Sequence, residues 1–140
     1  MIRSFKTEDL NSVMNLWLDT NIKAHSFIDK AYWQGNFNMV KKMMPQAAIY
    51  VYEQDSEIQA FIGLMDSYIA GIFVADELQS KGIGRTLLEY VKAKKDELSL
   101  SVYKKNSRAV QFYLKEGFSV TAEQIDEKTG ETEFLMKWIN

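Results

Sequence analysis

Two glycines separated by one residue, with a basic residue on each side, form the part of this sequence best suited to chemistry. The segment Lys81–Arg85 reads Lys-Gly-Ile-Gly-Arg; it follows an apolar run that ends at Val74 and opens a helical pattern. The first amides of a helix have no partner within the helix, and with the helix dipole they attract anions. Glycines leave the backbone accessible to a phosphate, and the two cations add positive charge. The pattern indicates a binding loop for a diphosphate.

The order of residues in this loop excludes two common nucleotide-binding motifs. A Walker loop needs Gly-Lys-Ser/Thr in that order, whereas Lys81 precedes Gly82 here. A dinucleotide-binding motif needs a third glycine at the position of Leu87. Taken alone, the two glycines are equally consistent with a relaxed turn before an amphipathic helix.

A second pair of residues, Asn106 and Tyr113, has the spacing of a shared helix face. They are seven positions apart, about two helical turns, so their side chains point the same way. The amide can hold an extended ligand, and a phenol with an ordinary pKa of about 10 can donate a proton to a leaving group. Each residue also has a structural interpretation, Asn106 as a helix N-cap and Tyr113 as a core aromatic.

Together the two segments resemble the signature of the GNAT superfamily of N-acetyltransferases. The first segment matches the pattern Gln/Arg-x-x-Gly-x-Gly/Ala through Gln79, Gly82 and Gly84. The second matches in order through Asn106, Ala109, Phe112-Tyr113 and Gly117-Phe118. The resemblance covers residues 58–120 well and is loose before Ile58, where such proteins bind different acceptors.

The resemblance implies an N-acyltransferase that moves an acetyl group from acetyl-CoA to a primary amine, by direct attack in a ternary complex. In this family the loop amides hold the CoA diphosphate, and the preceding strand pairs with the pantetheine arm. The backbone amide of Val74 or a near neighbour polarises the thioester carbonyl, and Tyr113 is the general acid that protonates the CoA sulfur. The implied CoA-binding residues are Phe73, Val74, Gln79, Ser80, Lys81, Gly82, Ile83, Gly84, Arg85 and Asn106.

The position of the general base departs from the family pattern. Many members that acetylate protein N-termini carry a glutamate twelve residues before the tyrosine, where this chain has Ser101. His25 is a candidate base or acceptor contact, because its pKa range suits proton transfer near neutral pH. Trp17 and the segment His25–Ile28 resemble a branch of small bacterial GNAT proteins; the alternative is a capping or packing histidine. Asp66 is a weaker candidate for acceptor contact, its alternative being a turn-forming aspartate.

Apolar periodicity predicts the elements that must position these residues. Strands are expected at 2–5, 48–52, 58–65, 68–74, 98–103, 118–125 and 133–139. Helices are expected from a cap at Thr7, over about 26–43, from the glycine loop onward, and from Asn106 to Glu116. The order β-α-α-β-β-β-α-β-α-β-β predicts an α+β fold, with a mixed, mostly antiparallel central sheet flanked by helices. Without a linker or repeat, residues 1–140 are expected to form a single domain.

Composition limits the cofactors and partners. A net charge of −2 and a pI near 5.5 give no general attraction to nucleic acid or to a membrane surface. The absence of cysteine excludes thiolate catalysis, and a single histidine excludes a multi-histidine metal site, so no metal is expected. The charged N-terminus lacks a signal-peptide core, which predicts a cytoplasmic protein. The basic residues Lys104, Lys105 and Arg108 form either a solvated face or a contact for CoA phosphates.

Other functions remain compatible with the same residues. A non-catalytic acyl-CoA binding or sensing module would keep residues 79–84 and Asn106 but would need no base. A GNAT toxin acting on aminoacyl-tRNA gains no support from the acidic charge balance, and a ligand-free interaction domain would leave the glycine loop unexplained. The acceptor, a small-molecule or peptide amine, stays open, as does the oligomeric state, for which a homodimer is compatible with the family.

Overall fold

A computed structural model describes all 140 residues, Met1–Asn140, and has the element order expected from the sequence. The strands are β1 (Ile2–Ser4), β2 (Ala48–Gln54), β3 (Glu57–Met65), β4 (Tyr68–Val74), β5 (Glu97–Tyr103), β6 (Ser119–Ile125) and β7 (Thr132–Ile139). The helices are α1 (Leu10–Ala24), α2 (Lys30–Met43), α3 (Ile83–Lys92) and α4 (Ser107–Lys115). Three single-turn 3₁₀ helices lie at Thr7–Asp9, Met44–Gln46 and Asp76–Leu78.

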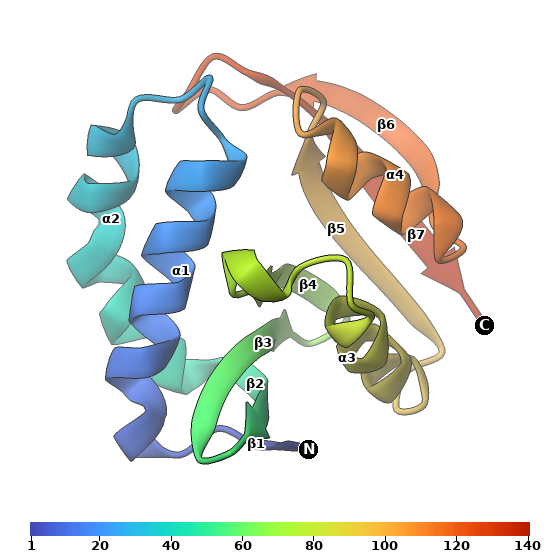
Figure 1. Ribbon diagram of the computed structural model, residues 1–140. Coiled ribbons are helices and arrows are strands. Elements are labelled where there is room, and N and C mark those ends of the chain that lie inside the picture. The colour runs from blue at the N-terminus through green and yellow to red at the C-terminus, as the bar shows by residue number, and fades with distance from the viewer.

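All seven strands form one sheet in the order β1-β2-β3-β4-β5-β7-β6. Every neighbouring pair is antiparallel except β4 and β5, which are parallel. The predicted α+β class with a mixed, mostly antiparallel sheet is therefore confirmed. Figure 1 shows α1 and α2 side by side on one flank, with β4 and β5 diverging in the middle of the molecule. No helix is both long and apolar enough to span a membrane.

Helices cover both faces of the sheet, and each face has its own buried cluster. Alternation along β3 divides the two, because successive side chains of a strand point to opposite faces. Ala60 and Ile62 lie in a cluster with side chains of α3 and α4, whereas Phe61 packs with side chains of α1 and α2. The sheet thus separates the α1–α2 pair from the α3–α4 pair.

The boundaries of two helices differ from the sequence-based expectation. Thr7 begins a 3₁₀ turn instead of capping α1, which starts at Leu10. The second helix starts at Lys30, because Asp29 accepts a hydrogen bond from the amide of Ala31 at 2.9 Å and so acts as its N-cap. Residues 25–28 form a separate turn between α1 and α2.

A charged cluster ties the N-terminal strand to the start of α1. The Arg3 guanidinium donates to both carboxylate oxygens of Asp9, at 2.8 and 3.0 Å, and to Glu53 at 3.1 Å. Asp9 is 5% exposed and also accepts the amide of Lys6 at 2.7 Å. The hydrogen bonds from Arg3 hold the pKa of the Asp9 carboxyl below its usual range.

Asp9→Asn is expected to lower the free energy of unfolding by about 1.5–3 kcal/mol at neutral pH, the range for a hydrogen bond to a charged group. A carboxyl with a depressed folded-state pKa stabilises the protein above its unfolded pKa, and that contribution disappears as pH falls through the folded value. The difference between Asp9→Asn and the parent should therefore shrink below about pH 4. Urea unfolding at pH 7 and at pH 3.5 measures it. An equal difference at both pH values would contradict the assignment.

Candidate active site

The parallel strands β4 and β5 pair at only two positions and then separate. Tyr68 pairs with Ser99 and Ile69 with Leu100, and beyond these residues the two strands share no ladder. The β3–β4 ladder is interrupted between Gly63 and Leu64, and Leu64 is the partner of Ile69. A bulge bends a strand and increases its twist. The irregularity thus lies where β4 leaves β5, and it opens the sheet along the rest of β4.

The backbone groups of β4 that face this opening belong to Ile72 and Val74. The backbone amide of Ala75 donates to the backbone carbonyl of Gln59 on β3 at 2.9 Å. The backbone groups of every second residue of β4 therefore point toward β3, and those of the residues between them point away. By this alternation Phe73 directs its N–H and C=O to β3, while Ile72 and Val74 direct theirs to the gap. The Gln79 side chain confirms the direction, because it donates to the Val74 carbonyl at 3.0 Å. Of the two strand residues expected to pair with a ligand, only Val74 has its backbone turned toward the gap.

The glycine loop leads into α3 and leaves the first amides of that helix unpaired. Gly82 is the N-cap and provides no side-chain cap, whereas α2 and α4 are each capped by a side chain. The first hydrogen bond of α3 runs from the Thr86 amide to the Gly82 carbonyl at 3.0 Å. The amides of Ile83, Gly84 and Arg85 precede it and have no partner in the helix. They form the uncapped helix N-terminus at which the sequence predicts anion binding.

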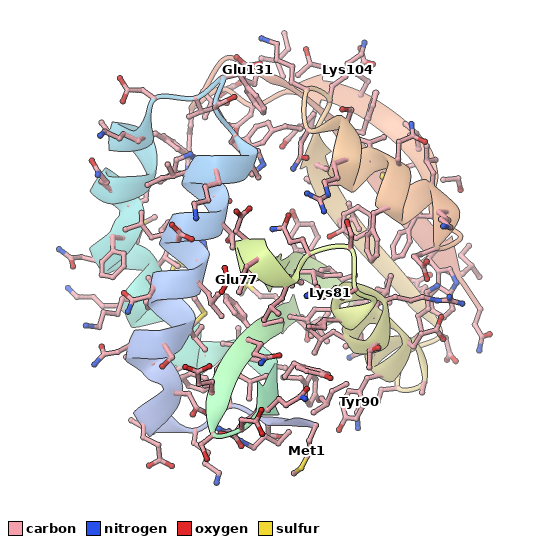
Figure 2. The ribbon with its side chains drawn as sticks, viewed as in Figure 1. Met1, Glu77, Lys81, Tyr90, Lys104 and Glu131 are labelled. Atoms are coloured by element: carbon pink, nitrogen blue, oxygen red, sulfur yellow. The ribbon has the colours of Figure 1, made fainter.

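Two residues of the loop before α3 have left-handed backbones. Ser80 has φ 66° and Gly82 has φ 89°, a conformation that favours glycine and is costly for serine. A Cβ on Gly84 would lie 3.7 Å from Phe112 and from Val74, so α3 packs closely on the end of β4. Figure 2 shows Lys81 on this loop, between β4 and α3.

A polar cleft of about 280 Å³ lies between the end of α1, the loop before α3 and the start of α4. It is lined by Lys23, Ala24, Asp76, Gln79, Lys105, Asn106, Ser107 and Arg108. Arg108 donates to the Ser80 hydroxyl at 2.5 Å, which joins α4 to the glycine loop across the divergent strands. Arg85, by contrast, is turned toward Glu116 at 3.5 Å. The structure thus brings Gln79 and Asn106, from the two sequence motifs, to a single cleft.

Tyr113 lies in the buried cluster that closes the base of the gap. It shares this cluster with Ile69 and Leu100, the last paired residues of β4 and β5. Its ring meets Phe112 and Phe118 edge to face, at centroid distances of 5.2 and 5.5 Å. No protein group hydrogen-bonds its hydroxyl. Burial raises the pKa of Tyr113, with a smaller contribution from Tyr68, so the phenol is protonated at neutral pH.

Asn106 and His25 are in direct contact, although 81 residues separate them. The side-chain carbonyl of Asn106 accepts a hydrogen bond from the backbone amide of Ala109 at 3.3 Å, so Asn106 is the N-cap of α4. Its amide nitrogen lies 3.1 Å from His25 Nε2, and His25 Nδ1 lies 3.1 Å from the carbonyl of Asn21. Burial lowers the pKa of His25. Both ring nitrogens of His25 are therefore engaged by groups of the protein.

Asp66, the weaker candidate for acceptor contact, and Ser101, at the position of the family glutamate, both lie away from the cleft. Asp66 sits in the β3–β4 turn with φ 55°, at the opposite end of β4 from the glycine loop, as a turn-forming aspartate would. Ser101 lies in the middle of β5 opposite Leu135. No group of three or more His, Cys, Asp or Glu side chains is arranged to hold a metal ion.

Two positions of the site were missed by the sequence analysis. Ile72 faces the gap with its backbone, which follows only from the β3–β4 register. A Cβ on Gly71 would lie 2.3 Å from the ring of Phe73, so this glycine makes room for the aromatic side chain that stacks on Phe61. The alternation of Gly71 and Phe73 on one strand face was the available signal.

Comparison with known proteins agrees with this geometry. The model of the acetyltransferase (GNAT) domain matches residues 19–139. The chain is 31% identical to the peptidyl-lysine N-acetyltransferase YiaC of Escherichia coli, over 99% of this chain and 96% of that protein. The solution structure of apo YjaB from E. coli superimposes with a TM-score of 0.87 and 23% identity, over 100% and 97% of the two chains. The structure of a variant of spermidine N-acetyltransferase SpeG from Vibrio cholerae superimposes with a TM-score of 0.74 and 18% identity, over 99% of this chain and 94% of that chain.

The chain belongs to the GNAT acetyltransferase family. It is an N-acetyltransferase that transfers an acetyl group to an amine, and family membership implies acetyl-CoA as the co-substrate.

Proposed function

We propose that this enzyme acetylates the ε-amine of lysine side chains in proteins or peptides, by direct attack on acetyl-CoA in a ternary complex. The observation that carries the reaction is the gap between β4 and β5, which outward backbone groups of β4 and the unpaired amides of α3 face, and whose last paired residues share a buried cluster with Tyr113. Two relatives, YiaC and YjaB, are peptidyl-lysine N-acetyltransferases, which supports lysine as the acceptor.

Each part of the gap has a separate role toward acetyl-CoA. The amides of Ile83, Gly84 and Arg85, with Lys81 beside them, bind the diphosphate. The outward N–H and C=O groups of Ile72 and the outward N–H of Val74 pair with the pantetheine arm as an added strand would, while the Val74 carbonyl keeps its hydrogen bond from Gln79. A second N–H and a second lone pair of the Asn106 side chain stay available for the same arm.

The transfer step forms a C–N bond and breaks the C–S bond. The neutral amine attacks the thioester carbonyl carbon, and an outward N–H of β4 stabilises the negative charge on the carbonyl oxygen. Tyr113 donates its proton to the departing sulfur, while the attacking nitrogen loses a proton to water. Burial raises the pKa of a phenol, and it acts in the same direction on a thiol at the same depth, which keeps the proton transfer matched. Proximity of the two substrates supplies much of the rate.

Two measurements test the proposal in order. Calorimetric titration with acetyl-CoA, with ATP and NAD as controls, should show binding of acetyl-CoA alone, and the ligand should raise the melting temperature. CoA release should then be followed with lysine-containing peptides, free lysine and spermidine. Faster release with peptides supports the proposal; preference for spermidine would overturn lysine as the acceptor, and binding without release would indicate an acyl-CoA sensor.

A further inference from the structure

The single histidine of the chain lies where the two halves of the active site meet. Its Nδ1 contacts the Asn21 carbonyl at the end of α1, and its Nε2 contacts the side chain of Asn106 at the start of α4. Helix α1 packs with α2 in the cluster on one face of the sheet, and α4 packs in the cluster on the other face, which contains Tyr113. This is the one side-chain hydrogen bond between α4, with its cap, and the α1–α2 region.

The donors and acceptors of this chain of contacts permit one assignment. The side-chain oxygen of Asn106 already accepts a hydrogen bond from the Ala109 amide. The side-chain NH2 group of Asn106 therefore faces His25 and donates to it. The Asn21 carbonyl can only accept, so His25 Nδ1 carries the proton. His25 is therefore the neutral Nδ1–H tautomer, with its Nε2 lone pair accepting from Asn106.

The ring is fixed by aromatic packing as well as by its two hydrogen bonds. It stacks on Trp33 of α2 at a centroid distance of 5.2 Å and 26°, and it meets Tyr103 of β5 and Phe27 edge to face. The titratable and charged groups around it are Tyr103, with Asp126 hydrogen-bonded behind it, Tyr32, Lys23 and Lys105. None of these groups hydrogen-bonds the ring.

We propose that His25 is a positioning residue: through Asn106 it holds the N-terminus of α4 in register with the α1–α2 pair. The first turn of α4 supplies Ser107 and Arg108 to the cleft, and Arg108 reaches on to Ser80 of the glycine loop. A shift of this turn moves the wall along which acetyl-CoA binds. The inference rests on the proposed acetyl-CoA site. It predicts that the affinity for acetyl-CoA depends on the position of α1 and α2.

The imidazole can be observed directly, because no other histidine contributes to its signals. Nitrogen-15 NMR should show the Nδ1–H tautomer and a pKa below the ordinary value of about 6.5. Asn106→Asp keeps the cap of α4 but replaces the donor with a carboxylate, which bonds only to a protonated Nε2. In that variant the His25 pKa should rise above 6.5. An Nε2–H tautomer in the parent, or an unchanged pKa in Asn106→Asp, would overturn the assignment.

The effect on the site is measured by acetyl-CoA affinity in a double-mutant cycle. His25→Phe keeps the aromatic packing and loses both ring hydrogen bonds, and Asn106→Ser keeps a good N-cap and loses the donor. His25→Phe should weaken acetyl-CoA binding by about 3- to 10-fold, the range for one hydrogen bond, and Asn106→Ser by at least as much. Asn106→Ser also loses the amide that faces the pantetheine arm, so the double variant should bind no more weakly than Asn106→Ser alone.

A matched control separates positioning from packing. Phe27→Leu reduces the packing on the ring and leaves both hydrogen bonds, so its affinity should stay within about twofold of the parent. Additive losses in the cycle, or no loss in either single variant, would refute the inference while acetyl-CoA binding by the parent still supports the proposed function. A parent that binds no acetyl-CoA would refute the proposed function itself. If His25→Phe fails to fold, the NMR assignment and the His25 pKa in Asn106→Asp decide the question.

Discussion

Tyr113→Phe is expected to slow acetyl transfer at least tenfold and to leave the affinity for acetyl-CoA within about twofold, because general acid catalysis contributes about 10²- to 10⁴-fold. The ring is buried between Phe112 and Phe118, and phenylalanine fills the same volume. The hydroxyl has no hydrogen-bond partner in the protein, so its removal leaves no buried group unpaired. The substitution therefore removes the acid and little else.

The measurement is kcat at saturating acetyl-CoA and acceptor, together with calorimetric affinity. Tyr90→Phe is a matched control, since this tyrosine lies on α3, packs edge to face on Tyr50 and has no role in the reaction. Its kcat should equal that of the parent. A Tyr113→Phe enzyme with unchanged turnover would show that another group protonates the sulfur.

Much of the fold is predictable from the sequence because the signals are local. The end of α4 is an example: Gly117 has φ 96°, and the amide of Phe118 bonds back to the carbonyl of Tyr113 at 3.0 Å, as expected for a glycine cap. The start of α2 was misplaced for a local reason as well. The apolar residues Phe27 and Ile28 extend the helical pattern backward, whereas Asp29 is the true cap.

Some features of the candidate site follow from a short sequence motif, whereas others arise only from the packing of distant elements. The glycine loop and its uncapped helix lie within six residues, so their geometry follows from the sequence. The choice between Phe73 and its neighbours as strand partners depends on the register of β3 against β4, and the irregularity at Gly63 sets that register. The contact of His25 with Asn106 depends on how the α1–α2 turn meets α4, which no local pattern encodes.

Gly82→Asp is expected to weaken acetyl-CoA binding by at least about 30-fold, whereas Gly82→Asn should weaken it by only a few-fold. The two substitutions have nearly the same size and tolerate the left-handed backbone of this residue, φ 89°, equally. A Cβ here meets nothing within 4 Å, so neither side chain disturbs the packing. The difference between them is one negative charge placed at the uncapped end of α3.

That charge would repel a diphosphate held by the same amides. Two unit charges about 4 Å apart interact by about 1–4 kcal/mol at the effective dielectric of a protein surface, and a diphosphate carries more than one charge. The carboxylate would also occupy the unpaired amides as an N-cap and compete with the ligand for them. Because salt screens exposed charges, the difference in acetyl-CoA affinity between the two variants should become smaller at high ionic strength. Calorimetric titration of both variants at low and high salt checks this, and equal affinities of the Asp and Asn variants would place the diphosphate away from the N-terminus of α3.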